Sequence, residues 1–120
     1  MFDGPEPIYV QIAEHLRRQI LDGALAEGDQ VMSTTQYATT YRINPATAAK
    51  AFAQLVDEGV IYKQRGVGMF VADGAREILR AERRQHFADH YLEPMLTEAR
   101  AVGLTTDSVI EMLRARAREQ

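Results

Sequence analysis

Residues 33–71 read STTQYATTYRINPATAAKAFAQLVDEGVIYKQRGVGMFV, and this stretch decides the fold. Its first four residues, Ser33 to Gln36, fit the capping box S-x-x-Q, which opens a short helix. Asn44 can cap a second helix, and Pro45 takes the first helical position, where no amide donor is needed. Arg42 interrupts the helical pattern between the two. The stretch therefore begins with a predicted helix-turn-helix.

The rest of the stretch predicts a two-stranded wing. Gly59 ends the second helix, whose apolar face is formed by Ala48, Ala51, Phe52, Leu55 and Val56. The β-rich runs 60–64 and 69–71 are joined by the hairpin signal RGVG, and Val31 offers a third short strand. We expect an α+β fold, mostly α with a small β wing. In such a winged helix-turn-helix, the second helix enters the DNA major groove.

Composition narrows the class of protein. The 120 residues suffice for one small domain with a helical appendage. The chain has no cysteine, which excludes disulfides and thiolate metal sites and agrees with a reducing cytoplasm. The acidic start does not resemble a signal peptide, and no apolar run approaches membrane-spanning length. No catalytic motif is present, so we expect a cytoplasmic, nucleoid-associated protein that is neither an enzyme nor a cofactor carrier.

The charge is not that of a typical nucleic-acid-binding domain. With 14 Lys and Arg against 17 Asp and Glu, the net charge is −3. The position of charge matters more than its total, however. Arg42, Lys50, Lys63 and Arg65 all lie on the elements that would face DNA. We therefore expect a dipolar domain with modest non-specific affinity.

The flanking segments suggest two parts, a DNA-binding domain over 1–74 and a helical dimerisation region over 75–120. A helix is predicted over 7–21, with apolar residues at i+4 steps and His15 as an isolated surface residue. The segment 72–74 reads as a hinge. A long charged helix then follows, which Pro94 should kink, and Thr105 can cap a last helix.

A two-helix hairpin leaves one apolar face open, and a second copy of the chain is expected to close it. The alternative is that this face packs back onto the chain's own first domain. The predicted dimer interface comprises Ile78, Leu79, Phe87, Tyr91, Leu92, Met95, Leu96, Val109, Ile110 and Leu113.

Several motifs together resemble the GntR family of bacterial transcription regulators. They are Pro7-Ile8-Tyr9, Ile43 to Thr47, Leu55 to Ile61, and Arg65 to Val71. The I-N-P-x-T start of the second helix and the short two-helix tail are similar to the YtrA-like subfamily. The resemblance implies a winged-helix dimer that binds an inverted-repeat operator. It also implies a repressor encoded beside membrane transporter genes, without a large effector domain.

The chain departs from the family pattern at three positions. Met32 stands where a proline is frequent, and Thr35 where an arginine often contacts phosphate. Lys50 stands at or near a frequent arginine, so the charge is kept while bidentate guanine geometry is lost. With an alanine-rich second helix, these changes leave few side chains to read bases.

The residues expected to contact double-stranded DNA lie in the helix-turn-helix and the wing. Thr47 and Lys50 would reach base edges, while hydroxyls, cations and glycines would approach phosphate. Asn44 is equally readable as a cap alone, and Lys50 as a solvated charge. The full predicted set is Ser33, Thr34, Arg42, Asn44, Ala46, Thr47, Lys50, Lys63, Arg65, Gly66 and Gly68.

Three other hypotheses remain open. His86 and His90 have the i, i+4 spacing of a metal site, although an exposed charged helix face explains them better. A winged helix with acidic surfaces could instead be a protein-interaction module that binds no specific DNA. A small-molecule effector of unknown identity could occupy a hydrophobic cleft.

Overall fold

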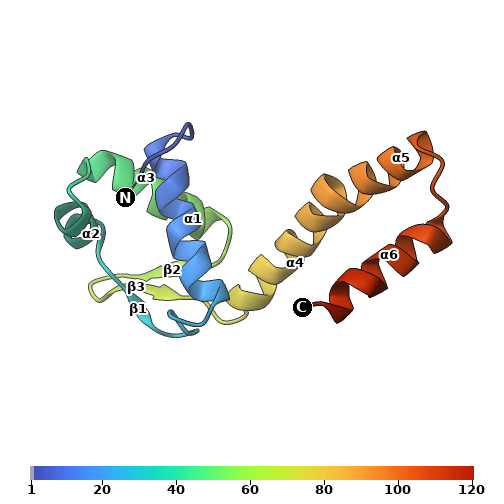
Figure 1. Ribbon diagram of the computed structural model, residues 1–120. Helices are drawn as coiled ribbons and strands as arrows, with labels where there is room; N and C mark the ends of the chain where they lie inside the picture. Colours follow the sequence, from blue (N-terminus) through green and yellow to red (C-terminus); the bar gives the residue numbers. More distant parts are fainter. Residues whose placement is uncertain (1) are drawn as a thin grey trace. The chain divides into compact units, whose positions relative to one another are not determined.

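The computed structural model describes residues 2–120, which divide into two compact units, one ending at Ala81 and the other spanning Glu82–Gln120. The first unit contains three helices, a small sheet and the start of a fourth helix (Figure 1). Its elements are α1 (Ile8–Leu21), β1 (Gln30–Val31), α2 (Thr34–Tyr41), α3 (Pro45–Asp57), β2 (Ile61–Gln64), β3 (Gly68–Val71) and the first turns of α4 (Ala75–Phe87). The predicted α+β fold with a small wing is confirmed.

Both predicted caps of the helix-turn-helix form. The Oγ of Ser33 accepts a hydrogen bond from the amide of Gln36 at 3.1 Å, which fixes the start of α2. The Oδ1 of Asn44 accepts from the amide of Ala46 at 2.8 Å, with Pro45 beginning α3. Short-range hydrogen bonding alone therefore sets both helix starts.

The sheet has three antiparallel strands in the order β1-β3-β2. Tyr62 lies opposite Phe70 in the β2–β3 pair, and their rings stack with centroids 5.7 Å apart. Gln30 lies opposite Phe70 on the other edge of β3, which confirms the third strand expected at Val31.

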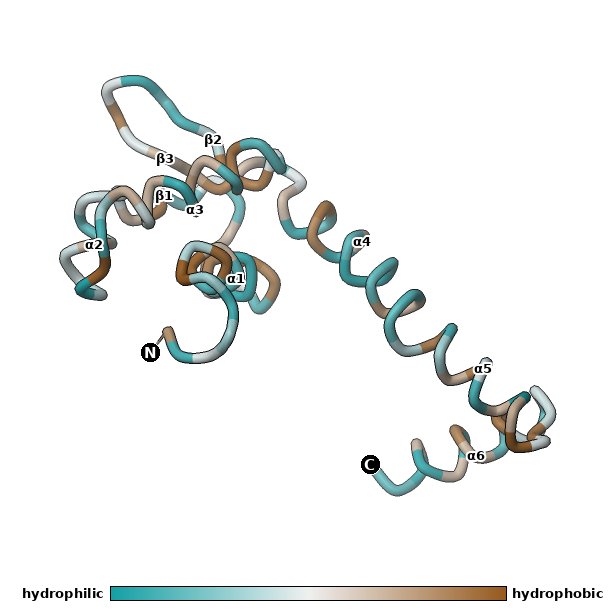
Figure 2. Tube along the Cα trace, turned by 90° about the horizontal axis from the view of Figure 1, so that it is seen from above, coloured by the Kyte–Doolittle hydropathy of each residue, from teal (hydrophilic) through white to brown (hydrophobic). Residues whose placement is uncertain are grey.

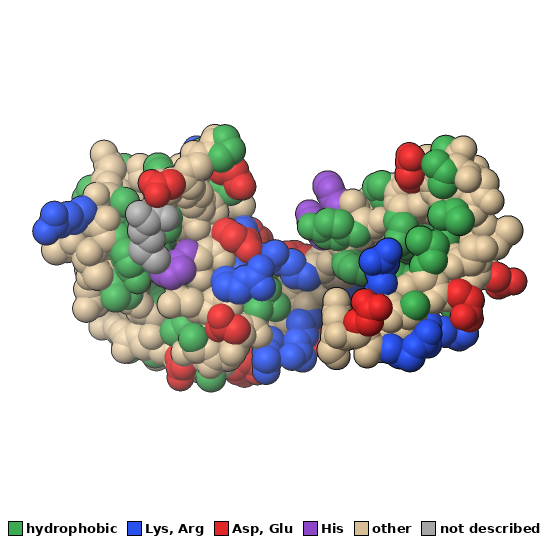
Figure 3. Space-filling model, viewed as in Figure 1, with side chains coloured by type: hydrophobic (Ala, Val, Ile, Leu, Met, Phe, Trp, Pro, Cys, Tyr) green, Lys and Arg blue, Asp and Glu red, His purple; other side chains and the backbone are tan. Residues whose placement is uncertain are grey.

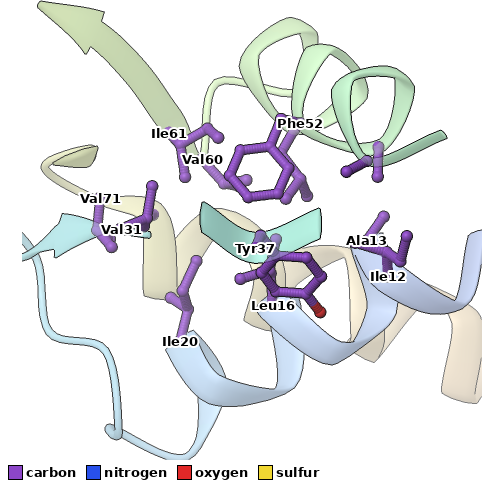
Figure 4. Close-up of a cluster of buried hydrophobic side chains, with 14 of the residues drawn as sticks. Ile12, Ala13, Leu16, Ile20, Val31, Tyr37, Phe52, Val60, Ile61 and Val71 are labelled. Carbon is purple, nitrogen blue, oxygen red and sulfur yellow. The ribbon is translucent and has the colours of Figure 1, made fainter. Parts of the chain in front are cut away.

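One hydrophobic core holds the first unit together. Figure 4 shows side chains of α1, including Ile12 and Leu16, facing Phe52 of α3 and Val60 at the foot of the wing. Val56, which the periodicity placed on this apolar face, is instead 39% exposed. The core thus packs α1 directly behind α3.

The first unit extends past the segment 72–74 that was expected to be a hinge. Ala75 and Leu79 of α4 are buried in the same core, and the Nε of Arg76 donates to the carbonyl of Leu21 at 3.1 Å. Leu79, expected at a dimer interface, is only 1% exposed and belongs to this core instead. The spacing of apolar residues shows that one face of this helix is apolar. It does not show whether that face packs against the first unit or against a second copy of the chain.

The second unit is helical. The end of α4 passes into a π-helical turn, Ala88–Leu92, which is followed by α5 (Glu93–Ala101) and α6 (Thr106–Arg118). Pro94 lies in the first turn of α5, so the expected disturbance takes the form of this π-turn just before it. Thr105 caps α6 as predicted, accepting from the amide of Ser108 at 3.1 Å. Hydrophobic and hydrophilic residues alternate along these helices (Figure 2). Across residues 2–120, no helix is both long and apolar enough to span a membrane.

Candidate nucleic-acid interface

The start of α2 and the turn after it present polar groups to solvent. Ser33 is exposed, and Thr34 is half-buried at the first position of the helix. Arg42 is exposed and adopts the left-handed conformation, with φ +55°, at the end of α2. This conformation ends the helix and leaves the guanidinium outside the core, where it can reach a phosphate.

The outer face of α3 is made largely of alanine. Lys50 is the long exposed side chain there, and the methyl groups beside it come from Ala46, Ala49 and Ala53. Thr47, which was expected to reach a base edge, is only half-exposed, and it lies with the half-exposed Gln54 on the flank of this face. A surface of methyl groups lets the helix approach closely and contact thymine methyl groups.

The cap at the start of α3 uses groups that were also expected to bind DNA. The amide of Ala46 donates to Asn44, so this N–H is engaged within the protein. The Asn44 side chain has a separate amide nitrogen that can still donate to a base or a phosphate. Capping and DNA contact are therefore compatible at Asn44, while Ala46 offers its methyl group.

Lys50 contacts the first helix. Its Nζ lies 4.0 Å from the centroid of the Tyr9 ring, a cation–π arrangement. Tyr9 is half-buried, and its packing against the core holds the ring in place. The sequence pattern does not predict the contact between Tyr9 and Lys50, because a contact between residues this far apart leaves no local pattern.

The wing carries exposed cations beside a tight turn. Lys63 and Arg65 are both exposed, and the amide of Val67 donates to the carbonyl of Gln64 at 3.0 Å across the turn. Gly66 occupies this turn with φ +78°, a conformation that favours glycine. The cations and the small turn residue suit contact with a phosphate backbone.

Gln30 of β1 supports the wing from its edge. Its Nε2 donates to the carbonyl of Val67 at 3.2 Å. A Cβ atom at Gly68 would lie 2.5 Å from this same nitrogen, and Gly68 has φ +145°. Gly68 therefore makes room for the Gln30 side chain, whereas nothing lies within 4 Å of a Cβ atom at Gly66.

His15 is not the isolated surface residue expected from the sequence. Its Nδ1 lies 2.8 Å from the hydroxyl of Tyr37, and its ring packs edge-on against Phe2 and Tyr41. Burial lowers the pKa of His15 and raises that of the Tyr37 hydroxyl. These rings tie α1 to α2 and therefore support the helix-turn-helix from behind.

His86 and His90 stack on each other in the second unit. Their ring centroids are 4.0 Å apart and the planes are 16° from parallel. Nitrogen lone pairs lie in the ring plane, so parallel stacked rings do not converge on one ion. The described residues, 2–120, contain no cluster of three or more metal-ligating side chains.

This fold is similar to that of known proteins. The family model for bacterial regulatory proteins of the gntR family matches residues 8–71, the span from α1 to the end of the wing. The chain belongs to the GntR family. It is therefore a DNA-binding transcription regulator and not an enzyme, as predicted.

Individual relatives agree with this membership. The transcriptional repressor YtrA of Bacillus subtilis is 29% identical over 108 residues, covering 90% of this chain and 82% of YtrA. The crystal structure of a GntR-family regulator from Bacteroides thetaiotaomicron is 27% identical, with a TM-score of 0.80, over 95% of this chain and 99% of that one. The resemblance to the YtrA-like subfamily is confirmed.

One solved GntR relative contains DNA. The crystal structure of the DNA-binding domain of AraR in complex with operator ORR3 is similar to this chain. The match covers 60% of this chain and 94% of the AraR chain. It is 27% identical, with a TM-score of 0.53.

Proposed function

We propose that this GntR protein is a homodimeric repressor that binds an inverted-repeat operator, one α3 to each half-site. The observation that carries the proposal is the exposed face described above, with Lys50 on α3 and Lys63 and Arg65 on the wing. An α-helix fits the major groove, and flanking cations add phosphate contacts. The resemblance to the YtrA-like subfamily supports the further proposal that the regulated genes encode a membrane transporter.

The proposed dimer is supported by the second unit, where apolar side chains are left uncovered. Ala99 and Val109 are its buried hydrophobic residues, while Phe87, Tyr91 and Val102 are 58–62% exposed. Figure 3 shows hydrophobic side chains gathered on the visible face of this unit. Apolar patches of this kind mark interaction sites. A second copy supplies the same patch by two-fold symmetry, so both are covered at once.

The same patch contains a groove between α5 and α6. Its volume is about 420 Å³ and its walls include Met95, Val102, Leu104 and Met112, with Arg116 at its rim. The partner's helices would fill much of this space. A small apolar effector that competes for the remainder would change the pairing of the two copies and thereby the spacing of their α3 helices.

Selection from random duplex DNA at moderate salt tests the operator. We expect one inverted repeat, bound by two chains, whose half-site spacing gives the distance between the α3 helices. Recovery of no motif would sink the proposal and favour a protein-interaction module.

Three substitutions test the proposed contacts on the selected operator. Lys50→Ala, Lys63→Ala and Arg65→Ala should each weaken binding and lower the slope of log affinity against log salt by about one if the side chain contacts phosphate. Arg18→Ala, at an exposed position of α1, is the matched control for loss of one charge. Unchanged affinity in the variant that combines all three would refute the assigned interface.

A further inference from the structure

We infer that Tyr9 is a positioning residue for Lys50 and thereby determines which base step Lys50 reads. The inference rests on the proposed contact between Lys50 and DNA. Its basis is the cation–π contact of 4.0 Å that joins the first turn of α1 to the outer face of α3.

A lysine at this position needs such a support. Its four-carbon side chain has many rotamers, and ordering it on DNA costs conformational entropy. Its neighbours at i−4 and i+3 are Ala46 and Ala53, whose methyl groups are too short to guide the lysine stem, while Thr47 and Gln54 at i−3 and i+4 lie half-exposed on the flank. The Tyr9 ring belongs to α1, and it supplies the neighbouring surface that these alanines lack.

The contact orients the ammonium without consuming its hydrogen-bond donors. A ring face attracts the whole cation, so three N–H groups remain available to a guanine or a phosphate. Lys50 is exposed, so its ammonium is accessible from solvent. The ring therefore fixes the ammonium before DNA arrives, and less entropy is lost when the complex forms.

The contact with Tyr9 also determines the direction in which the Lys50 side chain extends. Tyr9 belongs to α1, which packs directly on α3, so the side chain of Lys50 is drawn toward α1. Without the ring, the lysine could reach several neighbouring acceptors along the groove. Loss of Tyr9 should therefore reduce discrimination between operator and random DNA more than it reduces binding to random DNA.

A double-mutant cycle in the full chain tests the inference with Tyr9→Leu, Lys50→Met and the two together. Tyr9→Leu should weaken operator binding about two- to fivefold, and should have no further effect in the Lys50→Met background. Tyr9→Phe keeps the ring face and should restore wild-type affinity. Selection with Tyr9→Leu should return a motif degraded at one position of each half-site.

Several outcomes would overturn the inference, and they can be told apart. Additive losses, or tighter binding by Tyr9→Leu, refute the role of Tyr9 while Lys50 keeps its contact. If Lys50→Met changes neither affinity nor salt dependence, the proposed Lys50 contact fails and the inference fails with it.

The wild-type chain provides a second measurement that does not depend on a folded variant. The ring current of Tyr9 should shift the methylene proton resonances of Lys50 upfield, and the shift should persist in the operator complex. Disappearance of the shift when DNA binds would mean that Lys50 leaves the ring, which contradicts the inference.

Discussion

Arg17 and Glu58 join the first helix to the C-terminal end of α3 through an ion pair with two hydrogen bonds. The Nε of Arg17 donates to Oε1 of Glu58 at 3.0 Å, and Nη2 donates to Oε2. Side-chain exposures are 14% and 21%. The hydrogen bonds to Glu58 raise the pKa of Arg17, although partial burial acts in the opposite direction. Without Arg17, the Glu58 carboxylate would face the negative end of the α3 dipole.

This pair and the Tyr9–Lys50 contact connect the same two helices. The Tyr9–Lys50 contact lies eight residues earlier in both helices, since 17 − 9 and 58 − 50 are each 8. The first helix therefore holds α3 near its middle and at its end. Both contacts act on the helix that is proposed to enter DNA.

Removal of Arg17 should destabilise the first unit. Arg17→Met leaves the Glu58 carboxylate partly buried without its partner, and we expect a loss of about 1–3 kcal/mol in the free energy of unfolding. Urea denaturation followed by circular dichroism measures it. Arg18→Gln on the same helix removes an exposed pair with Glu14 and should cost less than about 0.5 kcal/mol. Equal losses in the two variants would show that the partly buried Arg17–Glu58 pair contributes no more to stability than the exposed Arg18–Glu14 pair.

The two wing glycines should differ in their tolerance of substitution. Gly68→Asn must adopt φ near +145° and displace the Gln30 side chain, so we expect a loss of about 2 kcal/mol in unfolding free energy and weaker DNA binding. Gly66→Asn is the matched control, because φ +78° suits asparagine and nothing lies within 4 Å. Similar stabilities for the two variants would show that Gln30 does not enforce glycine at position 68.

The sequence was sufficient to predict the elements whose limits depend on neighbouring residues. The serine and asparagine caps, Pro45 and the wing turn are local, and each can be recognised within a few residues. The face proposed to contact DNA could also be anticipated, since exposed cations on α3 and the wing follow from helical and strand periodicity.

What could not be predicted depends on pairs that lie far apart in the chain. The Arg17–Glu58 and Tyr9–Lys50 contacts each span 41 residues, and no local periodicity encodes them. Leu79 was assigned to an interface because its spacing shows only that one face is apolar. The fold decides that this face meets the core of the first unit.

His15 should make the stability of the first unit depend on pH. Burial lowers its folded pKa below the ordinary value of 6.5, so the unfolded chain binds a proton first as the pH falls. The stabilisation is complete above 6.5 and is lost as the pH falls from there through the folded pKa. Once the ring is protonated, Nδ1 can only donate, so the Tyr37 hydroxyl must accept this hydrogen bond.

The variant His15→Gln removes this titration while keeping a polar side chain near Tyr37. Unfolding free energies measured by urea denaturation between about pH 5 and 8 should decline less on the acidic side than those of the wild type. His86 and His90 are present in both chains, so the difference isolates His15. Parallel curves for the two proteins would refute the prediction.

Leu113 gives the sharpest test of dimerisation through the second unit. Its side chain is 51% exposed and lines the groove between α5 and α6. In a dimer, Leu113→Asp would bury a carboxylate in an apolar interface, and the cost of desolvating that charge exceeds what the rest of the patch can offset. Sedimentation equilibrium should then show a monomer at concentrations where the wild type is dimeric. Operator affinity should fall steeply, since only one half-site is held at a time.

Ala115→Asp is the matched control for this substitution. Ala115 is exposed on the same helix and does not line the groove, so the variant adds the same charge to α6 without entering the proposed interface. We expect it to remain dimeric. A wild-type chain that sediments as a monomer would refute the dimer itself. A dimeric Leu113→Asp variant would place the interface on another face, and the exposed groove would then be free to bind an effector.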